Sequence, residues 1–130
     1  MTRFFLITLL MLSNRPAYAE WLWASANDVQ GLTIYVDSDS VRRNGDKVTL
    51  WQLYDYKAVQ TVAGNSFLSS KAQRQFDCGN QRTKLLAFTH FTGNMGNGNR
   101  VMTDSNEAEW KPVAPGSVGH VLWRFACSKR

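Results

Sequence analysis

Hydrophobic and polar residues alternate along much of the chain, in short segments that end at glycine, asparagine or proline. A period of two residues is typical of β-strands with one face on a core and the other in solvent. The clearest such segments are residues 32–36 and 48–54, which are rich in β-branched and aromatic side chains. Between them stands Asn44-Gly45, the dipeptide preferred in tight hairpin loops. The pattern therefore predicts an antiparallel hairpin here.

Three further segments, residues 67–76, 82–91 and 100–102, continue the strand pattern. Between the last two, residues 93–98 contain three glycines and superficially resemble a phosphate-binding glycine loop. Such a loop must follow a strand and open a helix within a βαβ unit, whereas a short strand follows here. We therefore expect a turn between two strands, with a flexible binding loop as the secondary interpretation.

The period changes once, near the C-terminal end of the chain. Apolar residues recur there at helical spacing: Val118, Val121, Leu122 and Phe125. Ser117 precedes them and is a favoured N-cap residue. We expect an amphipathic helix of about three turns that packs this apolar face on the sheet. The predicted fold class is α+β, an antiparallel β-sheet meander with one packed C-terminal α-helix.

Residues 1–19 have the three parts of a secretory signal peptide: a positive start, a short apolar run, and Ala17 and Ala19 at the cleavage site. The apolar run is about half as long as a membrane-spanning helix, and no later segment is long enough. No cysteine follows the run to carry a lipid anchor. We expect residues 20–130 to form a single domain that is periplasmic or secreted.

The mature part of the chain contains two cysteines, Cys78 and Cys127. In an oxidising compartment an even pair is most simply a disulfide. The alternative is that one thiol is reactive, but reactive pairs are usually spaced as Cys-x-x-Cys, and these two lie far apart. The bridge would close a loop of about 50 residues, for which the chain-entropy model gives roughly 4 kcal/mol. It would tie the end of a strand to the helix.

Composition and charge exclude several classes of protein. Hydrophobic residues make up 44% of the chain, which is more than a disordered chain contains. The formal charge is +5, but the signal peptide carries two arginines and no acid, which leaves +3 on the mature part. That is too small for a dedicated nucleic-acid binder, so we expect no nucleic-acid partner.

Seven short motifs follow one another along residues 20–130. They are Tyr35-Val36-Asp37 with Ser40, Trp51 with Asp55-Tyr56-Lys57, Ser69-Ser70-Lys71, Phe76-Asp77-Cys78, Trp110-Lys111-Pro112-Val113, Pro115-Gly116-Ser117 and Ala126-Cys127. In this order they resemble the surface-adhesin protein E family of Gram-negative bacteria. The resemblance implies a small antiparallel sheet with one packed helix and a disulfide between the two cysteines. It also implies adhesion, because the family's namesake is an outer-membrane adhesin that binds host matrix and serum proteins such as vitronectin and laminin.

Basic and aromatic residues along the predicted strands are the candidates for partner binding. They are Arg42, Arg43, Lys47, Tyr54, Tyr56, Lys57, Lys71 and Trp110. Cations that share one face would attract an acidic partner, and exposed aromatic rings would anchor it. The alternative is a solvated strand face whose charges discourage edge-to-edge aggregation.

Catalytic and metal-binding candidates are sparse. His90 and His120 are the two histidines, they lie 30 residues apart, and no third ligand accompanies them at a recognisable spacing. We therefore expect no metal, no cofactor and no catalytic residue. A small secreted nuclease would need an acid, a base and cations, and the spacing favours no such set.

The sequence thus predicts an exported, non-enzymatic, adhesin-like domain that recognises a protein partner through a sheet face or edge. A host matrix or serum protein is the partner that the family resemblance implies. An exposed edge strand would also support a homodimer by strand addition. The first alternative is a periplasmic accessory or small-ligand-carrier protein without host contact, and the second is the secreted nuclease.

Overall fold

The computed structural model describes residues 20–128, and the predicted signal peptide, residues 1–19, lies outside them. The described residues form one antiparallel sheet, in which β1 to β6 are neighbours in chain order and β7 pairs with β5. The strands are β1 (Trp21–Asn27), β2 (Leu32–Asn44), β3 (Lys47–Val62), β4 (Asn65–Asp77), β5 (Arg82–Phe91), β6 (Arg100–Asp104) and β7 (Lys111–Pro112). A 3₁₀ turn, η1 (Asn94–Gly96), separates β5 from β6, and α2 (Val118–Ser128) ends the described chain. The predicted antiparallel meander with a C-terminal helix is confirmed.

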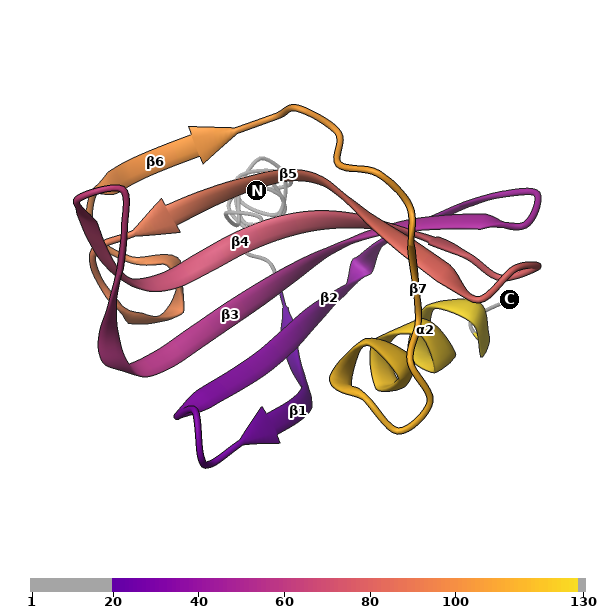
Figure 1. Ribbon diagram of the computed structural model, residues 1–130, viewed down its shortest axis with the longest axis horizontal. Helices are drawn as coiled ribbons and strands as arrows, with labels where there is room; N and C mark the ends of the chain where they lie inside the picture. The colour runs from indigo at the N-terminus through magenta and orange to yellow at the C-terminus, as the bar shows by residue number, and fades with distance from the viewer. Residues whose placement is uncertain (1–19, 129–130) are drawn as a thin grey trace, which may run out of the picture.

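The sheet is strongly curved, and α2 lies in front of one end of its concave face (Figure 1). The chain after β6 crosses the same end through β7 and then leads into α2. With 11 residues, α2 is about 16 Å long, whereas the 13 residues of β4 extend over about 43 Å. The helix therefore covers only part of the concave face.

The hydrophobic core lies between α2 and the concave face. Its buried members are Ile34, Val36, Val48, Leu50, Phe76, Leu122 and Ala126. On β2 and β3 they stand at alternate positions, as expected for strands with one face on the core. Burying each of the larger side chains contributes about 1.5–3 kcal/mol of hydrophobic free energy, so this contact holds helix and sheet together.

Two hairpins connect the long strands. The predicted first hairpin is present, but Asn44 pairs with Lys47, so the loop is Gly45-Asp46. Gly45 has φ of +62°, which favours glycine at the first position of a type II′ loop. The second hairpin was not predicted, because its loop is Ala63-Gly64 and lacks the usual Asn-Gly or Asp-Gly signal. Both of these residues have positive φ, 52° and 80°, as a type I′ loop requires.

The predicted helix is confirmed, with one correction. The backbone N–H of His120 donates to Ser117 Oγ at 3.1 Å, which makes Ser117 the N-cap. Leu122 and Ala126, four residues apart, form the buried stripe. Val121 was expected on the same face but is 45% exposed. Successive residues of a helix point about 100° apart, so Val121 points away from the sheet when its neighbour Leu122 faces it.

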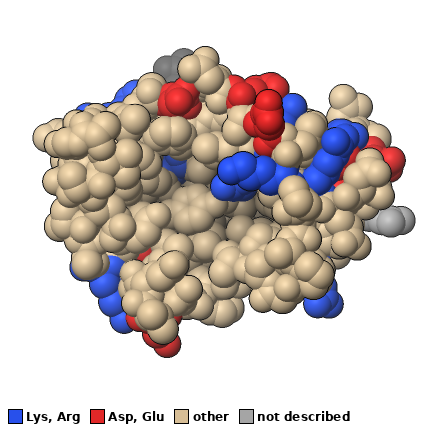
Figure 2. Space-filling view, in the orientation of Figure 1, with Lys and Arg blue, Asp and Glu red and all other residues tan. Residues whose placement is uncertain are grey.

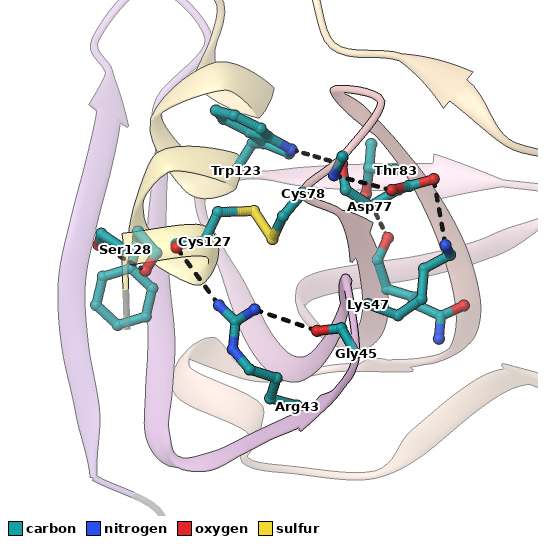
Figure 3. The surroundings of a disulfide bond; sticks show 12 residues. Arg43, Gly45, Lys47, Asp77, Cys78, Thr83, Trp123, Cys127 and Ser128 are labelled. Atoms are coloured by element: carbon teal, nitrogen blue, oxygen red, sulfur yellow. Dashed lines mark hydrogen bonds and ion pairs between the residues drawn. A yellow bond between two sulfur atoms is a disulfide. The ribbon is translucent and has the colours of Figure 1, made fainter. Parts of the chain in front are cut away.

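The predicted disulfide is present, and it joins the end of β4 to the last turns of α2 (Figure 3). The Cα atoms of Cys78 and Cys127 are 5.6 Å apart. Two hydrogen bonds add to this connection: Trp123 Nε1 donates to the Asp77 carbonyl oxygen at 2.9 Å, and Arg43 Nη2 donates to the Cys127 carbonyl oxygen at 3.4 Å. The helix is therefore tied to the sheet by a covalent bond as well as by packing.

The Asp77 side chain is fully buried beside this disulfide. Its carboxylate accepts hydrogen bonds from Arg82 Nε at 2.8 Å, Asn80 Nδ2 at 3.1 Å and the Gly79 N–H at 3.1 Å, and Lys47 Nζ lies 3.4 Å away. Burial alone would raise the pKa of Asp77, but these donors more than offset it and hold the pKa well below the usual range. The buried charge is therefore satisfied by its neighbours.

Candidate functional site

The concave face is open where α2 does not reach it. Figure 2 shows a hollow in the middle of this face, with Lys and Arg side chains along its upper rim. Eight side chains from β3, β4 and β5 line a space of about 340 Å³: Tyr54, Tyr56, Ser70, Ala72, Arg74, Leu85, Phe88 and His90. We call this space the hollow. It has a neighbour of about 240 Å³ against α2 and β7, and Tyr54 and Arg74 line both.

Two hydrogen bonds join two lining side chains, Arg74 and Tyr54, to Gln52, which lies behind the lining. Arg74 Nε donates to Tyr54 Oη at 3.2 Å, and Tyr54 Oη donates to Gln52 Oε1 at 2.7 Å. Gln52 is fully buried, and within residues 20–128 its Nε2 has no hydrogen-bond partner. These hydrogen bonds hold the guanidinium of Arg74 through its Nε atom.

Two other titratable groups in the hollow are held in their neutral forms. Burial, and secondarily the neighbouring Tyr54, raises the pKa of the Tyr56 phenol. Burial lowers the pKa of the His90 imidazole. Near pH 7 Arg74 is therefore the charged residue among the eight that line the hollow.

The two histidines do not form a common site. The His90 ring stacks on Phe67 with centroids 3.8 Å apart, and its Nδ1 is hydrogen-bonded to Ser70 Oγ. His120 lies on α2 and faces the ring of Trp123 at 6.0 Å. In the part of the chain that the structure describes, no three His, Cys, Asp or Glu side chains come together as metal ligands.

Lys47 and Trp110, two of the predicted binding residues, lie together near the cations that contact the Asp77 carboxylate. The Trp110 ring is surrounded by three cations: Arg82 at 4.6 Å, Lys84 at 4.7 Å and Lys47 at 5.9 Å from its centroid. Lys47 also pairs with Asp77. These charges are engaged within the molecule, so this cluster holds the segment before β7 against the sheet.

The remaining predicted binding residues lie at separate places. Arg42 is exposed, and its Nη1 donates to its own segment's carbonyl oxygens, whereas Arg43 lies next to the disulfide. Lys57 is exposed beside the turn at Gly31. Lys71 lies on the opposite sheet face from the hollow, 5.3 Å from the Phe91 ring centroid. Of the eight, Tyr54 and Tyr56 are the two that the fold brings together in the hollow.

The glycine-rich segment is a turn packed on the sheet. Asp55 Oδ1 accepts hydrogen bonds from the Met95 N–H at 2.8 Å and from Asn94 Nδ2 at 3.0 Å. The Gly96 N–H donates to Ser69 Oγ at 2.8 Å. These contacts hold η1 against β3 and β4, in agreement with the expectation of a turn between two strands.

Sequence reasoning did not single out the most exposed aromatic ring on the strands. Trp23 on β1 is 65% exposed, and its neighbour Leu22 is 44% exposed. Among the described strands β1 pairs with β2 alone, so its other side is an edge of the sheet. The available signal was the strand spacing of Trp21-Leu22-Trp23. The position of this strand at an edge of the sheet follows from the tertiary structure.

Comparison with models of protein families identifies the family of this chain. The model of the family "Surface-adhesin protein E" matches residues 21–128. The chain belongs to this family. The resemblance of the seven motifs is therefore confirmed, and membership of a surface-adhesin family implies an exported protein. No helix in the described part of the chain is long and apolar enough to cross a membrane.

Solved structures of Haemophilus influenzae protein E share this fold. Crystal form II matches with a TM-score of 0.67 at 13% identity, over 87% of this chain and 91% of that one. A second protein E structure gives a TM-score of 0.64 at 12% identity, over 87% of both chains. Protein E from a non-typeable strain gives 0.58 at 12% identity, over 87% and 86%. No curated protein sequence matches significantly. At these low sequence identities, the similarity to the protein E structures concerns the fold alone.

Proposed function

We propose that this member of the surface-adhesin protein E family is an exported, non-enzymatic binding domain that recognises a protein partner at the open edge of its sheet. The observation that supports this is β1, an edge strand with Trp23 and Leu22 exposed. Backbone N–H and C=O groups on such an edge can pair with an incoming strand. A large exposed aromatic ring supplies an anchor of the kind that dominates protein interfaces.

We assign the predicted basic residues a secondary role in this recognition, because most of them already have partners within the molecule. Lys47 is paired with Asp77, and Arg42 and Arg43 donate to backbone carbonyls of their own chain. Charges that are already engaged contribute less to a new partner, because their existing contacts must first be exchanged. The edge offers apolar surface without that cost, so we place the main contact on β1.

Binding of the mature domain to immobilised matrix and serum proteins tests this proposal. Trp23→Ala should lower the affinity at least about tenfold, the usual loss when a central aromatic anchor is truncated. Val29→Ala is the matched control, because Val29 is apolar and 97% exposed but lies in the turn after β1. Equal affinities of both variants and the wild type would remove β1 as the binding surface.

The same edge would also join two copies of the domain by strand addition. Sedimentation of the mature domain over a range of concentrations would then show a monomer–dimer equilibrium that Trp23→Ala shifts toward monomer. If the domain is a monomer at all concentrations, the homodimer is excluded, and the partner of the β1 edge would have to be a different protein.

The location of the protein decides between adhesion and a periplasmic role. Protease treatment of intact cells, with a lysed control, should degrade the domain on intact cells if it is displayed at the surface. Degradation only after lysis would favour the alternative of a periplasmic accessory or small-ligand carrier without host contact.

A further inference from the structure

The hollow on the concave face combines apolar walls with one unopposed positive charge. Rings and aliphatic carbons from Tyr54, Phe88 and Leu85 form much of its lining, and Arg74 supplies the charge. Among residues 20–128, no Asp or Glu lines the hollow or its neighbour against α2. Glu109 shares a third, smaller depression with Arg74, but no ion pair joins them among the described residues.

The guanidinium of Arg74 is oriented while two of its nitrogens stay available. Tyr54 Oη accepts from Nε at 3.2 Å and is itself held by Gln52. Within residues 20–128, neither Nη1 nor Nη2 of Arg74 makes a hydrogen bond or ion pair. A guanidinium fixed in this way presents donors whose spacing matches the two oxygens of a carboxylate.

A buried polar atom next to the lining residues, Gln52 Nε2, also lacks a partner within residues 20–128. Gln52 is fully buried, and its Nε2 is an unsatisfied donor next to Tyr54 and Ala72, both of which line the hollow. Buried donors are normally satisfied, and leaving one unpaired costs about 1–3 kcal/mol. Exceptions of this kind are found at sites that have been shaped for something other than stability.

The size of the hollow suits a small organic molecule. Its volume of about 340 Å³ lies in the range of small-molecule sites, roughly 300–1,000 Å³. An apolar cavity of about 150 Å³ holds one benzene ring, so there is room for a body about twice that size. The mixture of apolar walls with few polar groups is typical of such sites.

We propose that the hollow binds a small amphipathic carboxylate, with its apolar body against Phe88, Leu85 and Tyr54 and its carboxylate on Arg74. The carboxylate belongs either to a free organic acid or to the C-terminus of a peptide with an apolar last residue. This site is separate from the β1 edge, and it does not depend on the function proposed for that edge.

An NMR titration of the mature domain with 3-phenylpropionate tests the site, with uncharged 3-phenylpropionamide as the matched probe. The acid should bind at least about tenfold more tightly than the amide, because a charge-assisted hydrogen bond contributes about 1.5–3 kcal/mol. Equal binding of the two probes would overturn the proposal. A peptide ending in phenylalanine, with a free or an amidated C-terminus, distinguishes the two sources of the carboxylate.

Arg74→Gln should weaken binding of the acid at least about tenfold and leave the amide unchanged. Arg42→Gln is the control, since Arg42 is an exposed arginine outside the hollow. Trp23→Ala should bind the acid as tightly as the wild type, because Trp23 lies outside the hollow. The test of the hollow and the test of the β1 edge can therefore fail independently. If Arg74→Gln does not fold, the acid–amide comparison on the wild type still decides the question. Unchanged binding of the acid to folded Arg74→Gln would refute the assignment.

Discussion

The two ends of the concave face are built from the same strands but differ in what covers them. At the closed end, under α2, β3 and β4 present Leu50 and Phe76, which are buried core residues. At the open end the same strands present Tyr54 and Ser70 in the hollow. Arg74 stands between the two ends, since it pairs across the sheet with Leu50 and lines the hollow as well as its neighbour against α2.

The comparison shows that strand alternation selects a face, whereas the length of the helix decides which part of that face becomes core. Two of the side chains beyond α2, Tyr54 and Tyr56, carry a polar tip on an apolar body. Such side chains can line an open surface without exposing a large apolar patch. The closed end therefore stabilises the fold, and the open end leaves an accessible surface, where we propose the ligand site.

The largest expected effect comes from the disulfide, which fastens the closed end. Replacing both cysteines, Cys78→Ser with Cys127→Ser, should lower the free energy of unfolding by about 2–5 kcal/mol. The reason is that the bridge restricts a long loop in the unfolded chain, between residues 49 apart in the sequence. Urea denaturation at pH 7 measures the loss, and an unchanged midpoint would contradict the role given to the bridge.

The second prediction compares the two ends directly. Leu50→Ala at the closed end should cost about 3 kcal/mol, because a fully buried leucine leaves a cavity under the helix. Leu85→Ala at the open end should cost about 1 kcal/mol, because Leu85 is only partly buried and lines the hollow. Urea denaturation of the two variants in parallel tests the difference, and equal losses would show that the open end also belongs to the core.

The third prediction concerns the buried carboxylate beside the disulfide, whose effect should not exceed that of Leu50→Ala. Asp77→Asn should cost about 1.5–3 kcal/mol at neutral pH, because hydrogen bonds to a charged group are lost and Arg82 and Lys47 lose their partner. The folded-state pKa of Asp77 is lowered, so its contribution is present above the unfolded pKa of about 3.9 and is lost as pH falls through the lower folded value.

The wild type should therefore lose stability below about pH 5, while Asp77→Asn should lose less over the same range. Unfolding curves at several pH values between 7 and 2 measure this difference. Curves for the two proteins that stay parallel over the whole range would show that Asp77 is not the group responsible.

Prediction from sequence succeeded where a signal is local. The hairpin at Gly45, the N-cap at Ser117 and the strand over residues 82–91 all follow from a few neighbouring residues. It missed the hairpin at Ala63-Gly64, because alanine is a rare choice at a position with positive φ. It also put Val121 on the buried face, because helical spacing alone does not say which of two adjacent residues faces the sheet.

The candidate site was less predictable than the fold. Lys47 and Trp110 were expected to bind a partner, and the structure places them around an intramolecular ion pair. Tyr54 and Tyr56 were expected as exposed aromatic residues, and they form one wall of the hollow. Arg74 is one of several cations along the predicted strands, and nothing local set it apart from the others. The role proposed for it depends on its hydrogen bond to Tyr54 and on where the helix ends.

Without coordinates, one can recognise the period of the longer strands, the one change to helical period, the cysteine pair and the family; the short strand β7 was not predicted. These properties depend on neighbouring residues or on ordered motifs, so they can be recognised without coordinates. The tertiary structure alone decided which stretch of the sheet α2 covers, which cations are paired with acids, and that Arg74 faces an apolar hollow. Those outcomes depend on contacts between residues far apart in the chain, and such contacts exist only once the sheet has curved and the helix has docked on it.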